Sequence, residues 1–263
     1  MDTTAEGLAH RRVGTGPQPL LLLHGLGGDH RQPLVLLDDR LSRRCTAVAP
    51  DLRAHGATTL DDGPLHLDFR TLAGDIARLV AGLDVPAGDG WTVVGISLGA
   101  AVTAQLLADG AMPIRRAVLV RPAWPWEPAP ENLSVFPRIA DLLTAHGPEE
   151  GLRRFRDHPA RAAVQAVSPA AAQALTGQFT APDAARRAAR LRCLPAVAPA
   201  RPGGPVPPTL VVGSPQDPVH PVAIAQRVAA DLDAEHLEVA PRYDAPERHA
   251  REVTAALHAV LGT

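Results

Sequence analysis

The stretch VVGISLG, residues 93–99, decides the fold of this chain, because an apolar run ends there in the pattern Gly-x-Ser-x-Gly. An apolar strand joined to a helix-forming run by this pentapeptide predicts a sharp turn that exposes the hydroxyl of Ser97. The turn is too tight for side chains at Gly95 and Gly99, and the run AAVTAQLL at 100–107 predicts a helix. The free amide groups at the start of that helix would face anything bound to Ser97.

Length and composition favour one soluble α/β domain, with room for an insertion. The chain has 263 residues, of which 46% are hydrophobic, and a formal net charge of −2. This charge gives no reason to expect a nucleic acid or an anionic membrane as a partner. All 26 basic residues are arginine, which suggests a GC-rich bacterial genome and excludes Schiff-base chemistry and a Walker A phosphate site. The sequence carries no signal for the oligomeric state.

Cysteine usage and the N-terminal residues predict a cytoplasmic protein. Cys45 and Cys193 lie far apart in the sequence and form no metal or redox motif, so we expect buried thiols in a reducing compartment. The first residues, MDTTAE, are polar and do not resemble a signal peptide. The apolar run at 20–23 is far too short to span a bilayer.

Short apolar runs alternate with longer amphipathic stretches, as in a parallel sheet with helices on both faces. The strands expected are Leu20–Leu23, Thr46–Ala49, Thr92–Gly95, Ala117–Val120, Thr209–Val212 and His236–Val239. The helices expected between them are Pro33–Leu41, Phe69–Leu83, Leu98–Asp109, Pro221–Asp231 and Pro246–Leu261.

The alternation fails between Pro122 and Pro208, where helical stretches lie between prolines. Examples of these stretches are Glu131–His146, Glu149–Asp157 and Pro182–Leu191. We interpret residues 122–205 as a helical cap inserted into a core formed by residues 1–121 and 206–263.

At this point the chain resembles the α/β-hydrolase family, because four motifs occur in the family's order, each after an apolar strand. They are HGLGG at 24–28, PDLRAHG at 50–56, the GISLG pentapeptide around Ser97, and GSPQDPVHP at 213–221. The family usually has glycine at the position of Ala54. The resemblance implies an α/β fold with a mostly parallel central sheet and flanking helices.

The resemblance also implies roles for particular residues. Ser97 would be the nucleophile, and a hydroxyl needs an adjacent base to act as one. The backbone amides of Leu26 and Leu98 would form the oxyanion hole. Asp217, five residues past the strand Thr209–Val212, occupies the position of the family's acid; the alternative is an Asp-Pro turn, which the same residues would also form. The alternative acid position, at the end of the preceding strand, holds Arg121.

The expected base is His249, the one histidine between the last strand and the body of the last helix. Family members usually carry this base in a loop, whereas His249 falls in the second turn of the expected helix. It shares the inward stripe with Val253, so it would point towards the sheet. A buried structural histidine is the alternative. His236 and His258 are weaker candidates.

Other residues carry weaker expectations. His24 and His55 are interpreted as structural, and no Cys or His cluster indicates a metal site. Trp124 could line the pocket mouth or pack at the surface. Arg121 could bind a substrate carboxylate or form a structural ion pair.

The sequence therefore predicts a cofactor-free serine hydrolase that cleaves an ester or thioester of a small or medium acyl compound through an acyl-enzyme. There are two alternatives. One is a ligand-binding protein that has kept the fold but lost turnover, and the other is a lyase or perhydrolase that uses the same residues.

Overall fold

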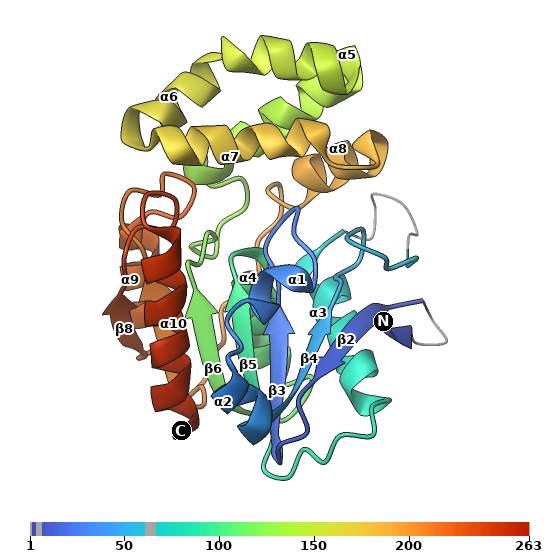
Figure 1. The fold of residues 1–263 in the computed structure, drawn as a ribbon, viewed down its shortest axis with the longest axis vertical. Coiled ribbons are helices and arrows are strands. Elements are labelled where there is room, and N and C mark those ends of the chain that lie inside the picture. The colour runs from blue at the N-terminus through green and yellow to red at the C-terminus, as the bar shows by residue number, and fades with distance from the viewer. Residues whose placement is uncertain (1, 4–6, 61–66, 263) are drawn as a thin grey trace.

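One mixed sheet forms the centre of the molecule in a computed structural model, which describes residues 2–3, 7–60 and 67–262 (Figure 1). Eight strands of this part of the chain follow the order β1-β2-β4-β3-β5-β6-β7-β8. They are β1 Asp2–Thr3, β2 Ala9–Val13, β3 Gln18–Leu23, β4 Cys45–Pro50, β5 Trp91–Ile96, β6 Ile114–Val120, β7 Thr209–Gly213 and β8 Glu235–Glu238. The pairs β1–β2 and β2–β4 are antiparallel, and all other neighbours are parallel.

Helices cover both faces of the sheet and bury its apolar side chains. Alternate residues of β3 separate the two cores: Leu20 and Leu22 pack with α10, whereas Leu21 and Leu23 pack with α3. The helices of the core are α1 Arg31–Leu34, α2 Asp39–Arg44, α3 Phe69–Ala81, α4 Leu98–Asp109, α9 Val222–Asp231 and α10 Pro246–Leu261. None of the described helices is both long and apolar enough to cross a membrane.

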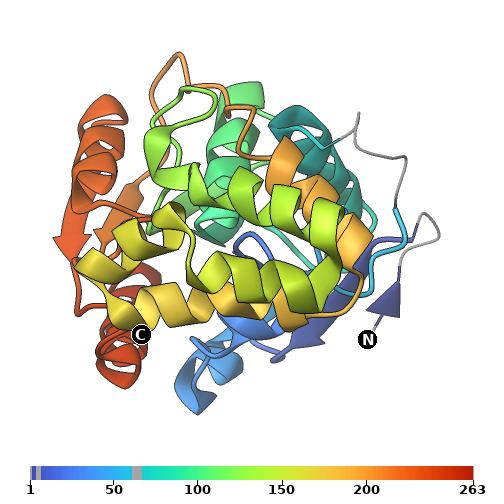
Figure 2. The ribbon, with the colours of Figure 1, turned by 90° about the horizontal axis from the view of Figure 1, so that it is seen from above.

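Four helices between β6 and β7 lie over the carboxyl edge of the strands, as Figure 2 shows from above. They are α5 Val135–Arg156, α6 Pro159–Val167, α7 Pro169–Thr180 and α8 Ala184–Cys193, preceded by the short helix η2 Glu131–Leu133. The helix α5 kinks at Gly147, whose φ of 72° interrupts the helical backbone and is followed by Pro148. This kink separates the two helices expected at Glu131–His146 and Glu149–Asp157.

The mostly parallel sheet with flanking helices confirms the predicted fold class. All six expected strands exist, with bounds that differ by up to three residues. Two details were wrong or missed. The helix expected at Pro33–Leu41 is divided into α1 and α2, and α2 begins only after Asp38, whose carboxylate accepts a hydrogen bond from the amide of Leu41. The edge strand β2 was not expected, because its sequence AHRRV lacks a regular apolar pattern.

Candidate active site

Ser97 lies at the turn between β5 and α4, where the backbone is strained. Its φ is 54° and its ψ is −105°, outside the regions that side chains ordinarily occupy. The flanking glycines are required by close contacts: a Cβ at Gly95 would lie 2.2 Å from the carbonyl oxygen of Gly99, and one at Gly99 would lie 2.3 Å from that of Leu23. The tight turn predicted at residues 95–99 is therefore present.

A chain of hydrogen bonds connects Ser97 to a carboxylate through His220. The Nε2 atom of His220 lies 2.8 Å from Oγ of Ser97, and its Nδ1 atom lies 2.9 Å from Oδ2 of Asp217. Because a carboxylate only accepts hydrogen bonds, Nδ1 carries the hydrogen and Nε2 is left to accept the hydroxyl proton of Ser97. All three residues are buried.

His220 and Asp217 lie on one short loop after β7, and hydrogen bonds within this loop fix their relative positions. Oδ1 of Asp217 accepts the backbone amides of Val219 and His220, each at 3.2 Å. The carbonyl of Asp217 also accepts the amide of His220 at 3.1 Å. This single turn brings both side chains to the same side of the loop, facing the carboxyl end of β5.

Arg121 also binds the carboxylate of Asp217. Its Nη1 atom lies 2.8 Å from Oδ2 of Asp217, the same oxygen that accepts the ring of His220. Burial opposes ionisation of Asp217, but the favourable interactions with His220 and Arg121 outweigh it and hold the pKa of this carboxyl below its ordinary value. Burial also lowers the pKa of His220, against the opposing effect of Asp217. The ring is therefore neutral at pH 7 and able to accept a proton.

The loop after β3 lies against Ser97 and presents a backbone amide. Residues 25–28 form a turn in which the amide of Gly28 donates to the carbonyl of Gly25 at 2.9 Å. The side chain of Gln32 braces this turn by accepting the amide of Gly25 at 2.6 Å. Among the described residues, the amides of Leu26 and Leu98 have no backbone partner, and Leu26 lines the cavity that contains Ser97.

The cavity at Ser97 is small, with a volume of about 100 Å³. Its floor comes from the core and includes Arg121, His220 and Tyr243. Its roof comes from α5 and α7 of the overlying helices, through Phe136, Ala174, Leu175 and Gln178. Access to Ser97 therefore depends on the helices between β6 and β7.

The structure does not support the role of base expected for His249. His249 is buried in α10, as expected, but its Nδ1 atom donates to the carbonyl of Ala240 at 2.9 Å. The ring next to Ser97 is that of His220, which the sequence analysis passed over although it lies inside the fourth motif. Two features of the sequence draw attention to His220, because residues 240–245, APRYDA, contain no histidine and His220 follows Asp217 by three residues, but neither feature shows which group the ring meets.

Two further expectations are resolved by contacts. Trp124 is not among the residues that line the Ser97 cavity, and it is not at the surface, because it is 2% exposed and its ring packs edge-on against Phe69 at a centroid distance of 5.2 Å. Arg121 forms the structural ion pair with Asp217 and also lines the Ser97 cavity. The sequence alone could not separate these alternatives.

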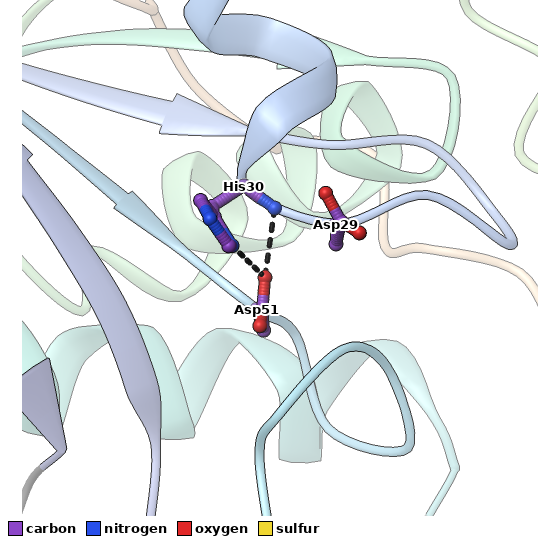
Figure 3. Close-up of side chains that lie close together, drawn as sticks. All are labelled: Asp29, His30 and Asp51. Atoms are coloured by element: carbon purple, nitrogen blue, oxygen red, sulfur yellow. Dashed lines mark hydrogen bonds and ion pairs between the residues drawn. The ribbon is translucent and has the colours of Figure 1, made fainter. Parts of the chain in front are cut away.

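A cluster of Asp29, His30 and Asp51 lies at the loop after β3 (Figure 3). Among the described residues, these side chains are the group whose arrangement could hold a metal ion. The lone pairs of Asp51 already have protein partners: Oδ1 accepts the amide and the ring of His30 at 2.7 and 2.8 Å, and Oδ2 accepts the amide of Ala57 at 2.8 Å. Asp29 is paired with Arg31 at 2.6 Å. The cluster thus braces the loop that carries Leu26.

Comparison with known proteins identifies the family of this chain. The model of the alpha/beta hydrolase family matches residues 20–257, most of the chain. The chain belongs to the alpha/beta hydrolase family. Similarity to individual proteins is more limited. The acetyltransferase component of the acetoin cleaving system from Cupriavidus necator is 34% identical over 113 residues, which are 43% of this chain and 29% of that protein.

A second curated relative also matches only part of the chain. The pyrrolizixenacetamide deacetylase of Xenorhabdus hominickii is 36% identical over 107 residues, covering 41% of this chain and 38% of the relative. The chain thus matches well under half the length of these curated relatives. Among solved structures, the enol-lactonase from Burkholderia xenovorans LB400 superposes with a TM-score of 0.72 at 21% identity, over 97% of this chain and 96% of the other. At this identity the match shows the shared fold.

Proposed function

We propose that this alpha/beta hydrolase is a serine hydrolase that cleaves an ester or thioester of a small acyl group through an acyl-enzyme. The observation that carries the proposal is the unbroken chain of hydrogen bonds from Ser97 through His220 to Asp217. A nucleophile, a base within hydrogen-bond reach and a group that orients the base are the parts that acyl transfer requires.

In the first half-reaction, Oγ of Ser97 attacks the acyl carbon and its proton passes to Nε2 of His220. The amides of Leu26 and Leu98 would receive the negative charge that develops on the carbonyl oxygen, and one such donor is typically worth about 10²–10³ in turnover. His220 then gives the proton to the departing alcohol or thiol, which leaves Ser97 acylated.

In the second half-reaction, water takes the place of the leaving group. Nε2 of His220 removes a proton from the water as its oxygen attacks the acyl carbon, and the proton returns to Oγ of Ser97 when the acid is released. Throughout, Asp217 holds the hydrogen on Nδ1 and stabilises the charged ring. The resulting balance is one ester or thioester bond broken and one water consumed.

The size of the Ser97 cavity supports a small acyl group. A volume of about 100 Å³ holds roughly three water molecules at their share of liquid volume. We therefore expect acetyl and propionyl esters to be cleaved faster than octanoyl esters. Pyrrolizixenacetamide deacetylase, named for removal of an acetyl group, is consistent with a small acyl substrate.

The test is labelling by a fluorophosphonate probe, which reacts with activated serines. The wild-type protein should be labelled, and Ser97→Ala should not, whereas Ser134→Ala, which changes a serine at the start of α5, should be labelled like the wild type. Absence of labelling in a folded wild-type protein would favour a ligand-binding protein without turnover. Product analysis with an acetyl ester then separates hydrolysis from lyase or perhydrolase chemistry.

A further inference from the structure

A second cavity, here named the α10 cavity, lies next to the Ser97 cavity on the side of α10. Its volume is about 270 Å³, larger than that of the Ser97 cavity. Arg121 and Gln32 line both cavities, and Ile96, the residue before the nucleophilic serine, lines the α10 cavity. The two spaces thus share a wall, and the α10 cavity has no part in the chemistry proposed for Ser97.

The walls of the α10 cavity are mostly apolar. The apolar side chains come from α1 and the following turn, from the ends of β5 and β6, and from the first turns of α10. They are Val35, Leu36, Ile96, Val120, Ala250 and Val253. Val35 is 70% exposed, which is unusual for a large apolar side chain and places uncovered hydrophobic surface at this cavity.

The charge of Arg242 favours an anion in the α10 cavity. Arg242 lines the cavity and is half-buried, yet it has no carboxylate partner among the described residues. Burial lowers the pKa of this guanidinium, which means that its charge is poorly solvated where it stands. The guanidinium carbon lies 6.0 Å from the centre of the Tyr243 ring, and the like charge of Arg121 also lowers the pKa of Arg242. A bound anion would compensate for the lost hydration.

Two buried side chains add unused hydrogen-bonding atoms to the same cavity. Nε of Arg121 is buried and has no partner, while the residue itself is 5% exposed. His249 donates through Nδ1 to Ala240, and burial lowers its pKa to about 4, so at pH 7 its Nε2 carries no hydrogen; it can accept a hydrogen bond from a water but cannot bond a carboxylate itself. Glu247 is the one acidic residue of the lining, and it is exposed, where water screens its charge.

We propose that the α10 cavity is a binding site for a small apolar carboxylate, with the carboxylate on Arg242 and the hydrocarbon part against Ile96 and Val253. A volume of about 270 Å³ corresponds to roughly nine water molecules at their share of liquid volume, so an organic acid with about eight or nine non-hydrogen atoms fits. This chemistry has two sources: a free acid, such as ester hydrolysis releases, or the carboxylate end of a substrate. Only the second source rests on the proposed function.

The test measures binding in Ser97→Ala, so that its result does not depend on turnover. Hexanoate binding is followed by calorimetry, with hexanamide as the uncharged analogue. Arg242→Gln should weaken hexanoate binding by roughly ten- to a hundredfold, the range for a hydrogen bond to a charged group. Arg251→Gln, which removes the same charge from an exposed position on α10, should leave the dissociation constant within about twofold, since an exposed charge contributes little.

A second variant tests the cavity without changing its charge. Ala250→Leu would reduce the space in the α10 cavity and should weaken hexanoate binding, whereas Ala255→Leu, at an exposed position of the same helix, should not. The proposal is overturned if hexanoate fails to bind at roughly 10 mM, beyond the weak end of the usual affinity range, if hexanamide binds equally well, or if Arg251→Gln weakens binding as much as Arg242→Gln.

Inhibition of the wild-type esterase then distinguishes the two sources of the carboxylate. If hexanoate inhibits competitively and Arg242→Gln abolishes this inhibition, the cavity binds one end of the substrate. If the inhibition is noncompetitive and the same variant abolishes it, the cavity binds a free acid. Either pattern supports the site. If the wild-type protein has no esterase activity, the proposed function is overturned. The binding measured by calorimetry in Ser97→Ala is unaffected by that result.

Discussion

His220 lies three residues after Asp217 on one loop, and its Nδ1 donates to Oδ2 of that carboxylate at 2.9 Å. The base and the group that orients it are thus carried by the same turn after β7. No movement of α10 is needed to bring them together, because α10 contributes neither residue. The geometry of the site depends on this loop and on the turn at Ser97.

Two histidine variants test which ring acts as the base. His220→Ala should lower kcat on a small neutral ester by about 10⁴ or more, as removal of the base does in serine hydrolases. His249→Ala should lower kcat by less than about tenfold, because its ring is bonded to Ala240 and not to Ser97. Steady-state kinetics with p-nitrophenyl acetate measures both. A larger loss in His249→Ala than in His220→Ala would contradict the assignment.

The pH dependence of kcat/KM tests the charges around His220. Because burial lowers the pKa of His220 below its ordinary 6.5, activity should rise with pH along a limb centred below 6.5 and reach a plateau at neutral pH. The ionisable groups around this ring are Asp217, Arg121 and, beyond them, Arg242 and Tyr243. Of these, Asp217 favours the protonated ring and Arg121 disfavours it.

Arg121→Gln should therefore move the acidic limb to higher pH. The substitution removes the cation that shares Oδ2 of Asp217, so the protonated ring becomes more stable and a higher pH is needed to deprotonate it. The expected shift is roughly one pH unit, the lower end of the effect of a neighbouring charge. Arg251→Gln, which removes an exposed charge, should leave the limb in place. An unchanged limb in Arg121→Gln would show that the ion pair does not act on His220.

Two glycines of contrasting surroundings test the strain at the turn. Gly95→Ala would place a Cβ 2.2 Å from the backbone of Gly99, so we expect it to lower the free energy of unfolding by about 3 kcal/mol or more. Gly177→Ala, within α7, would bring the new Cβ within 4 Å of no atom beyond its chain neighbours and the backbone of its own helix, so it should raise the free energy of unfolding by about 0.5–1 kcal/mol. Urea unfolding measures both. Equal effects of the two substitutions would contradict the packing described at Gly95.

The sequence predicted the parts of this structure that local pattern determines. Buried parallel strands are continuous apolar runs, so β3, β5 and β7 were evident, and the glycines around Ser97 specified the turn. The strand β2 was missed because an edge strand needs no such run. The helices α6 and α7 were missed although each follows a capping side chain, His158 and Ser168 respectively, and begins with proline.

The base was missed for a different reason, since its position depends on contacts between distant parts of the chain. His220 bonds to Ser97 across 123 positions of sequence, and nothing in the spacing of the loop shows that its ring faces β5. The helical stripe of α10 did place His249 inward, and the structure has it buried. An inward direction alone does not determine which group a side chain meets.

The cluster of Asp29, His30 and Asp51 gives a last prediction, which concerns metal dependence. Because the oxygens of Asp51 already accept bonds from His30 and Ala57, we expect the cluster to stabilise the loop after β3 without a metal ion. Dialysis against a chelator should leave the melting temperature and kcat unchanged. Asp51→Asn should lower the free energy of unfolding by about 1–3 kcal/mol, since an amide NH₂ would face backbone donors in a buried position. A melting temperature that falls on chelation and recovers with added Zn²⁺ would instead assign the cluster to a metal.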